Sequence, residues 1–75
     1  MESTAFMVAK RIAAAIREDI RILSGDIMGP SDATWHDVAG TLQCNLEVLS
    51  RLVDRARAGG DNSFIPMLTE WILED

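Results

Sequence analysis

The chain has 75 residues, 48% of them apolar and 25% charged, which fits one small folded domain rather than a disordered tail. Its net charge of −5 opposes general attraction to nucleic acid and to anionic membranes. No apolar run is long enough to span a bilayer, and the N-terminal residues lack a signal-peptide pattern. A single cysteine, Cys44, cannot form an internal disulfide, so we expect a cytoplasmic protein.

The first predicted element is an amphipathic helix from about Thr4 to Ser24. Gly25 suits the left-handed residue that ends such a helix, and residues 29–32 form a Gly-Pro-Ser-Asp turn cluster. The helix is predicted because apolar residues recur every three or four positions on one face, with basic and acidic residues opposite. These apolar residues are Val8, Ile12, Ile16, Ile20, Leu23 and Ile27.

Two short helices joined by a tight turn are predicted in the middle of the chain. Thr34 stands three residues before Asp37, which resembles a capping box and favours a helix over residues 35–43. Asn45 is a good cap for a following helix over residues 46–58. The turn would then lie near Gln43.

The predicted C-terminal helix follows a glycine break. Gly59 and Gly60 end the preceding helix, and Asp61-Asn62-Ser63 provides new caps. Pro66 falls in the first turn of a helix over residues 64–74, where its missing amide costs little.

The predicted fold class is all-α, because no segment shows the alternation of a strand. We expect one domain over residues 1–75, a small bundle of about four helices with a helix-turn-helix-like pair in the middle. Trp35 and Trp71 lie on the apolar faces of their helices, so both should be buried against the first helix. Cys44 occupies a core offset and should be a buried thiol.

The middle segment "DVAGTLQCNLEVLSRLV" resembles the DNA-reading helix-turn-helix of bacterial transcription regulators. The similarity is to the cyclic-AMP receptor and fumarate–nitrate regulator class, and also to the lactose-repressor class. Ala39 would be the small residue at the helix contact. The resemblance implies that Glu47 and Arg51 meet base edges. The matching residues are Thr34, Asp37, Val38, Ala39, Leu42, Glu47, Ser50 and Arg51.

A second resemblance is to the death-domain family of signalling modules. It is carried by "TWHDVAGTL", in which Trp35 opens a helix, and by the later "MLTEW" with Leu68 and Trp71. This resemblance implies a helical bundle that assembles with other proteins and has no catalytic activity.

Residues that could carry chemistry do not form a recognisable constellation. His36 is the single histidine, and no cysteine lies near it with zinc-ligand spacing. Cys44 has no base placed to activate it. We therefore expect no enzymatic activity, no metal and no cofactor.

Electrostatics ranks the two remaining functions. Arg51, Arg55 and Arg57 are partly cancelled by Glu47 and Asp54, which weakens binding to phosphates. Leu46 and Val48 could instead form an exposed apolar ridge suited to a protein partner. The sequence therefore favours a small regulatory module that binds a protein, with DNA as the second candidate partner and self-association also open. The predicted partner-binding residues are Leu46, Glu47, Val48, Ser50, Arg51, Asp54 and Arg55.

Overall fold

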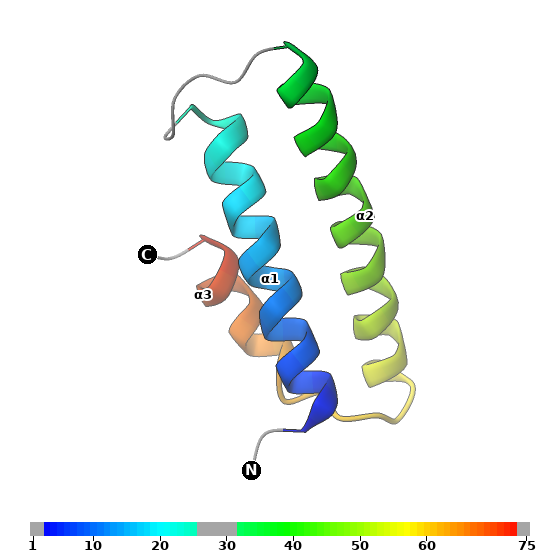
Figure 1. The fold of residues 1–75 in the computed structure, drawn as a ribbon. Coiled ribbons are helices and arrows are strands. Elements are labelled where there is room, and N and C mark those ends of the chain that lie inside the picture. The colour runs from blue at the N-terminus through cyan, green and yellow to red at the C-terminus, as the bar shows by residue number, and fades with distance from the viewer. Residues whose placement is uncertain (1–2, 26–31, 74–75) are drawn as a thin grey trace.

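The computed structural model describes residues 3–25 and 32–73, and every regular element in these two ranges is helical. Two long helices, α1 (Thr4–Leu23) and α2 (Asp32–Arg57), run side by side in opposite directions (Figure 1). A 3₁₀ turn, η1 (Ile65–Met67), leads into a short helix, α3 (Leu68–Leu73). The all-α small bundle predicted from the sequence is confirmed.

Helix α1 begins and ends where the sequence predicts. The Ser3 side chain accepts a hydrogen bond from the Phe6 amide at 3.1 Å, which satisfies one of the free amides of the first turn. The last turn is followed by Gly25 with φ of +84°, a left-handed conformation that glycine adopts without strain.

Helix α2 differs from the prediction, because 26 residues form one unbroken helix from Asp32 to Arg57. The predicted turn near Gln43 is absent, so the prediction of a helix-turn-helix geometry for this segment is wrong. Asp32 also precedes the predicted cap at Thr34, which lies inside the helix. The turn cluster proposed over residues 29–32 lies mostly outside the described residues.

The continuous helix follows from an apolar register that never shifts. Alternating steps of four and three residues bring the same side of a helix back to its neighbour, as in a coiled coil. A turn at Gln43 would break this register. The residues at these inward-facing positions, all of them buried or partly buried, are Val38, Leu42, Asn45, Leu49, Leu52 and Ala56.

Asn45, predicted as a cap, instead joins the two long helices. Its side-chain amide donates to the carboxylate of Asp19 on α1 at 3.3 Å. Among the described residues, Asp19 is the one buried polar residue, with 9% of its surface exposed. A buried carboxylate needs a donor, so this contact satisfies Asp19 and fixes which residues of α1 and α2 lie level.

Helix α2 ends just before Gly59 and Gly60, as predicted, and the chain turns back at Gly59, which has φ of +129°. Asp61 then connects the turn to the start of α1. It accepts hydrogen bonds from the Ser3 hydroxyl and, at 3.0 Å, from the Ser63 amide. These bonds favour the charged carboxylate and lower the pKa of Asp61, the Ser3 bond having the larger effect.

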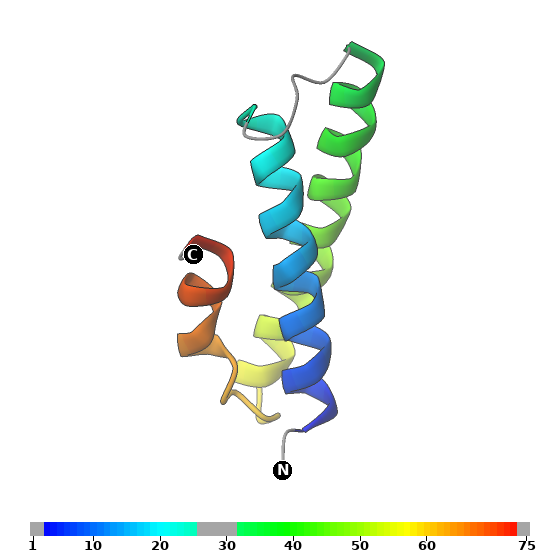
Figure 2. The same ribbon diagram turned by 60° about the vertical axis from the view of Figure 1, so that its left-hand side comes forward.

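Helix α1 is the centre of the bundle, with α2 on one side and α3 on another (Figure 2). Ala9 and Ala13 are fully buried, and their small side chains allow the neighbouring elements to approach closely. Phe64 fills the space between the elements with no exposed surface. Phe6 and Trp71 form an edge-to-face pair with ring centroids 5.1 Å apart, which attaches α3 to α1.

The two tryptophans have different environments, contrary to the prediction that both are buried. Trp71 is partly buried against the core, but Trp35 leaves 46% of its surface exposed. Trp35 lies near the start of α2, beyond the part of the bundle that α3 covers (Figure 1). Cys44, predicted as a buried thiol, is exposed, because it lies one residue before the inward-facing Asn45 and points away from the seam.

We predict that Trp71→Ala lowers the free energy of unfolding by roughly 3–5 kcal/mol, since it removes a packed aromatic from the core. Trp35→Ala, the matched change at an exposed tryptophan, should cost less than about 1.5 kcal/mol. Urea unfolding of both variants followed by circular dichroism measures the difference. Equal losses for the two variants would contradict the packing described above.

A second prediction concerns the middle of α2. Gln43 is exposed and helical, so Gln43→Gly should be about 1 kcal/mol less stable than Gln43→Ala. A left-handed turn at this position would give the opposite order, because glycine tolerates that conformation and alanine does not. Thermal unfolding of the two variants distinguishes a continuous helix from a turn.

Candidate protein-binding surfaces

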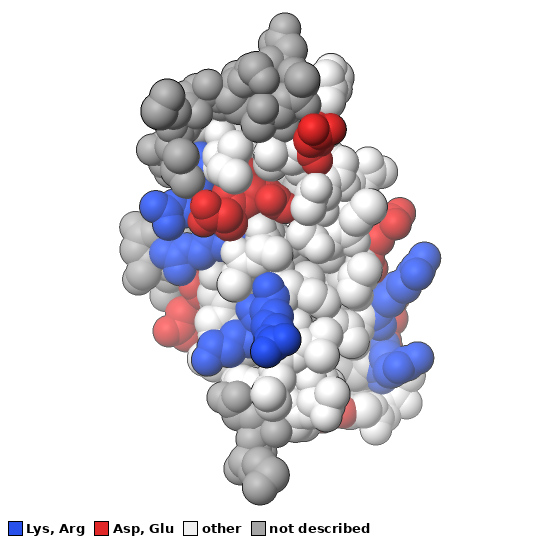
Figure 3. Space-filling view, viewed as in Figure 1, with Lys and Arg blue, Asp and Glu red and all other residues white. Residues whose placement is uncertain are grey.

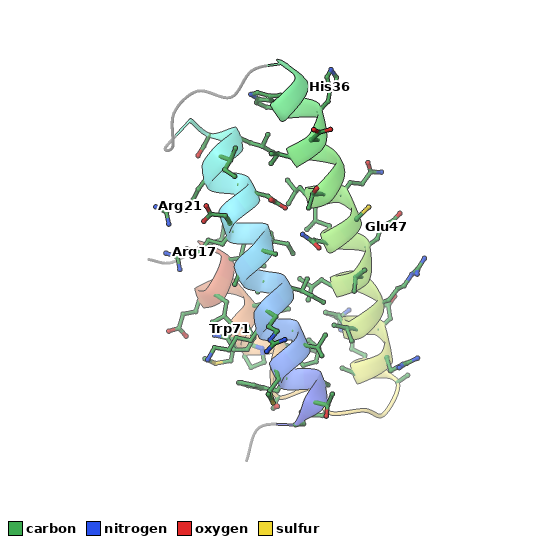
Figure 4. The ribbon with its side chains drawn as sticks, viewed as in Figure 1. Arg17, Arg21, His36, Glu47 and Trp71 are labelled. Carbon is green, nitrogen blue, oxygen red and sulfur yellow. The ribbon has the colours of Figure 1, made fainter. Side chains whose placement is uncertain are left out.

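The predicted apolar ridge on α2 is divided between two faces of the hairpin formed by α1 and α2. Successive residues of a helix turn by about 100°, so Leu46 and Val48 point about 200° apart. Glu47, between them, points directly away from α1 (Figure 4). Because α2 is right-handed and runs downward in this view, Val48 turns toward the viewer and Leu46 turns away.

Leu46 lies on the side of the hairpin that carries α3, which is behind α1 in Figure 1 and to its left in Figure 2. Trp35 precedes Leu46 by eleven residues, close to three turns, and therefore projects from the same side. Ile20 follows Phe6 by fourteen residues, close to four turns, and so shares the side of α1 that contacts Trp71.

We call this region the open face, defined by Ile20, Trp35, Leu42 and Leu46. Helix α3 has six residues and packs against the part of α1 near Phe6, so it does not extend over this region (Figure 2). The exposed fractions are 37% for Ile20, 46% for Trp35 and 47% for Leu46. The open face is therefore an apolar surface that the bundle leaves uncovered.

The opposite side of the hairpin carries a second surface, which we call the basic face. It is seen directly in Figure 3, where basic side chains border an uncharged strip. Each long helix contributes a shallow hollow to it, the first lined partly by Val8 and Arg11, the second by Val48, Arg51, Leu52 and Arg55. The basic face consists of Val8, Arg11, Val48, Arg51, Leu52 and Arg55.

The seven predicted partner-binding residues thus fall into three groups. Val48, Arg51 and Arg55 lie together on the basic face. Leu46 and Ser50, one turn apart, lie on the side of the open face. The remaining two, Glu47 and Asp54, are exposed on the outer edge of α2.

Sequence reasoning missed most of the open face. Ile20 and Trp35 belong to apolar stripes and were assigned to the core. No local signal separates these positions from core positions, because their exposure depends on α3 packing near Phe6 and not over them. Val8 and Arg11 were missed on the basic face because they are distant from α2 in sequence.

The residues with reactive side chains are spread out. His36 and Cys44 are both exposed on α2, eight residues apart and hence separated by about 12 Å along the axis. Within residues 3–25 and 32–73, no three histidine, cysteine or acidic side chains are grouped as a metal site would require. No helix in the same ranges has the length and hydropathy needed to cross a membrane.

No family model, curated protein or solved structure matches the chain. The resemblances to bacterial regulators and to death domains therefore rest on their motifs alone.

Proposed function

We propose that the protein is a small non-catalytic regulatory module that acts by binding another protein through its open face. The observation that carries this proposal is the exposure of Trp35 and Leu46 together, on the side of the hairpin where α3 ends early. Large apolar side chains that share an uncovered face are typical of interaction sites.

The composition of the open face suits a protein partner. Covering apolar surface stabilises a complex by roughly 25 cal/mol per Å² removed from water. Tryptophan is enriched among the residues that dominate binding energy, because its large rigid ring loses little freedom when covered. Ile20 and Leu46 lie about three turns from Trp35 on the same side of the hairpin, so the tryptophan is one end of an elongated apolar surface.

The alternative, DNA recognition through a helix-turn-helix, has less support. That mode needs a turn that presents the start of a second helix to the major groove. In α2 the residues expected to read bases, Glu47 and Arg51, lie in the middle of a continuous helix. The acidic net charge of −5 further weakens non-specific attraction to phosphates.

We predict that Leu46→Asp abolishes capture of the protein partner, since it places a charge in the apolar contact. Val48→Asp is the matched control: the two side chains are 47% and 45% exposed, on the same helix but opposite faces. Quantitative affinity capture from host extract, with wild type and both variants as bait, measures the effect. Circular dichroism verifies that all three baits keep their helical content.

A partner retained by wild type and Val48→Asp but lost from Leu46→Asp supports the open face. Equal retention by both variants would contradict it. Wild-type binding to duplex DNA that falls steeply with salt and disappears in Arg51→Ala would make DNA recognition the better account.

A further inference from the structure

The basic face has a charge pattern unlike that of the rest of the chain. The protein carries seven basic and twelve acidic residues, yet the described residues of this face include three arginines and no acid. Val8 and Val48 are 39% and 45% exposed between the arginines. Apolar surface bordered by positive charge is therefore concentrated here.

The arginines stand on both sides of the apolar strip. Val8 is two residues beyond Phe6, so it points about 200° away from the contact with α3, and Arg11 follows it by one turn. On α2, Arg55 lies two turns after Val48 on the same side. Because α1 and α2 are antiparallel and Asp19 is level with Asn45, Val8 is nearly level with Arg55. Each helix therefore forms one border of the apolar strip.

Acidic residues limit the length of this surface. Glu18 lies two turns beyond Arg11 on α1, and Asp37 lies three turns before Val48 on α2, both facing the same way. Figure 3 shows acidic side chains above the basic side chains that border the uncharged strip, with further basic side chains along the left edge. The stretch from Val48 to Arg55 spans about 10 Å, or two helical turns.

We propose that the basic face binds an amphipathic helix of another protein, one with an apolar stripe bordered by acidic residues on both sides. The stripe would lie over Val8, Val48 and Leu52, and the acids would meet Arg11 on one border and Arg55 on the other. A helix fits the groove between two helices that lie side by side, and the attraction between its acids and the arginines on both borders fixes its orientation. This site is separate from the open face, so it adds a second partner surface.

The same arginines fit DNA less well. Phosphate backbones favour continuous positive charge, whereas the centre of this face is apolar and Glu18 and Asp37 lie close beyond it. Glu47 and Asp54 add negative charge along the outer edge of α2. A short acidic helix avoids these four acids, and a duplex that extends past the site does not.

The test uses a labelled helical peptide of about 15 residues, with a leucine and alanine stripe bordered by glutamates over its central two turns and by uncharged residues at its ends. A second peptide has lysine in place of every glutamate, and a short DNA duplex is the third probe. Binding to the full chain is measured by fluorescence anisotropy at two salt concentrations. We expect the glutamate peptide to bind at least about tenfold more tightly than either other probe, with weaker binding at high salt.

Two double variants with the same charge change locate the site. Arg11→Glu with Arg55→Glu should weaken glutamate-peptide binding at least about tenfold. Arg21→Glu with Arg57→Glu is the control, and it should stay within about twofold. Both residues are exposed; Arg21 points to the outer edge of α1 (Figure 4), and Arg57, two residues after Arg55, points about 200° away from it. If charge reversal reduces helical content, Arg11→Gln with Arg55→Gln should show a smaller loss in the same direction.

Equal losses in the two double variants would overturn the proposal, since they would reflect net charge alone. Stronger binding of the duplex than of the glutamate peptide would also overturn it, as would failure of all three probes to bind. Sedimentation equilibrium adds one further outcome: a dimer that dissociates in the Arg11/Arg55 variant would assign this face to a second copy of the chain. Because Val48 lies on the basic face, the Leu46 and Val48 comparison distinguishes the two surfaces: a protein lost only from Leu46→Asp is a partner of the open face, and one lost only from Val48→Asp is a partner of the basic face.

Discussion

The antiparallel seam between α1 and α2 determines the rest of the structure. Its apolar register runs without a shift from Val38 to Ala56, so α2 gains most by remaining one straight helix along α1. The Asp19–Asn45 hydrogen bond lies within the seam and specifies the level at which the helices meet. A buried polar contact of this kind favours one register over its neighbours, since a slip would leave the carboxylate without its donor.

Both surfaces of the protein follow from this seam. The six-residue α3 leaves much of the two long helices uncovered, because it packs near Phe6 and covers only part of one side of the hairpin. The uncovered part of that side exposes Trp35 and Leu46. The other side has no third helix among the described residues, and there the outward positions of both helices are exposed. The shape of the hairpin thus produces an apolar surface and a basic surface on opposite sides.

The sequence predicted those features that depend on local chemistry. The bounds of α1 follow from its apolar period, and the left-handed residue after α1 at Gly25 and the chain reversal at Gly59 follow from the conformations that glycine allows. The prediction of a break at Gln43 was wrong. A small residue such as Ala39 at a helix contact, with leucines three and four residues apart, also occurs in a continuous helix that packs along a neighbour. Asn45 has the chemistry of a cap, but its tertiary partner Asp19 determines its role.

The candidate surfaces were less predictable than the helices. Leu46 and Val48 cannot share a ridge, because two residues apart on a continuous helix they point about 200° from each other. The pairing of Arg11 with Arg55 depends on the antiparallel contact between distant segments, and the exposure of Trp35 depends on where α3 ends. A single sequence gives the period of each helix but not which part of each face a neighbour will cover.

Both surfaces depend on the continuity of α2 through Gln43–Asn45, because a turn there would change the directions of all the side chains that follow. Nuclear magnetic resonance tests it directly through Cα chemical shifts and through-space contacts between successive amides over residues 41–47. A continuous helix predicts helical shifts and unbroken amide-to-amide contacts throughout. Loss of both at residues 43–45 would contradict the account, because Leu46 would then begin a separate helix and the helix-turn-helix geometry would be restored.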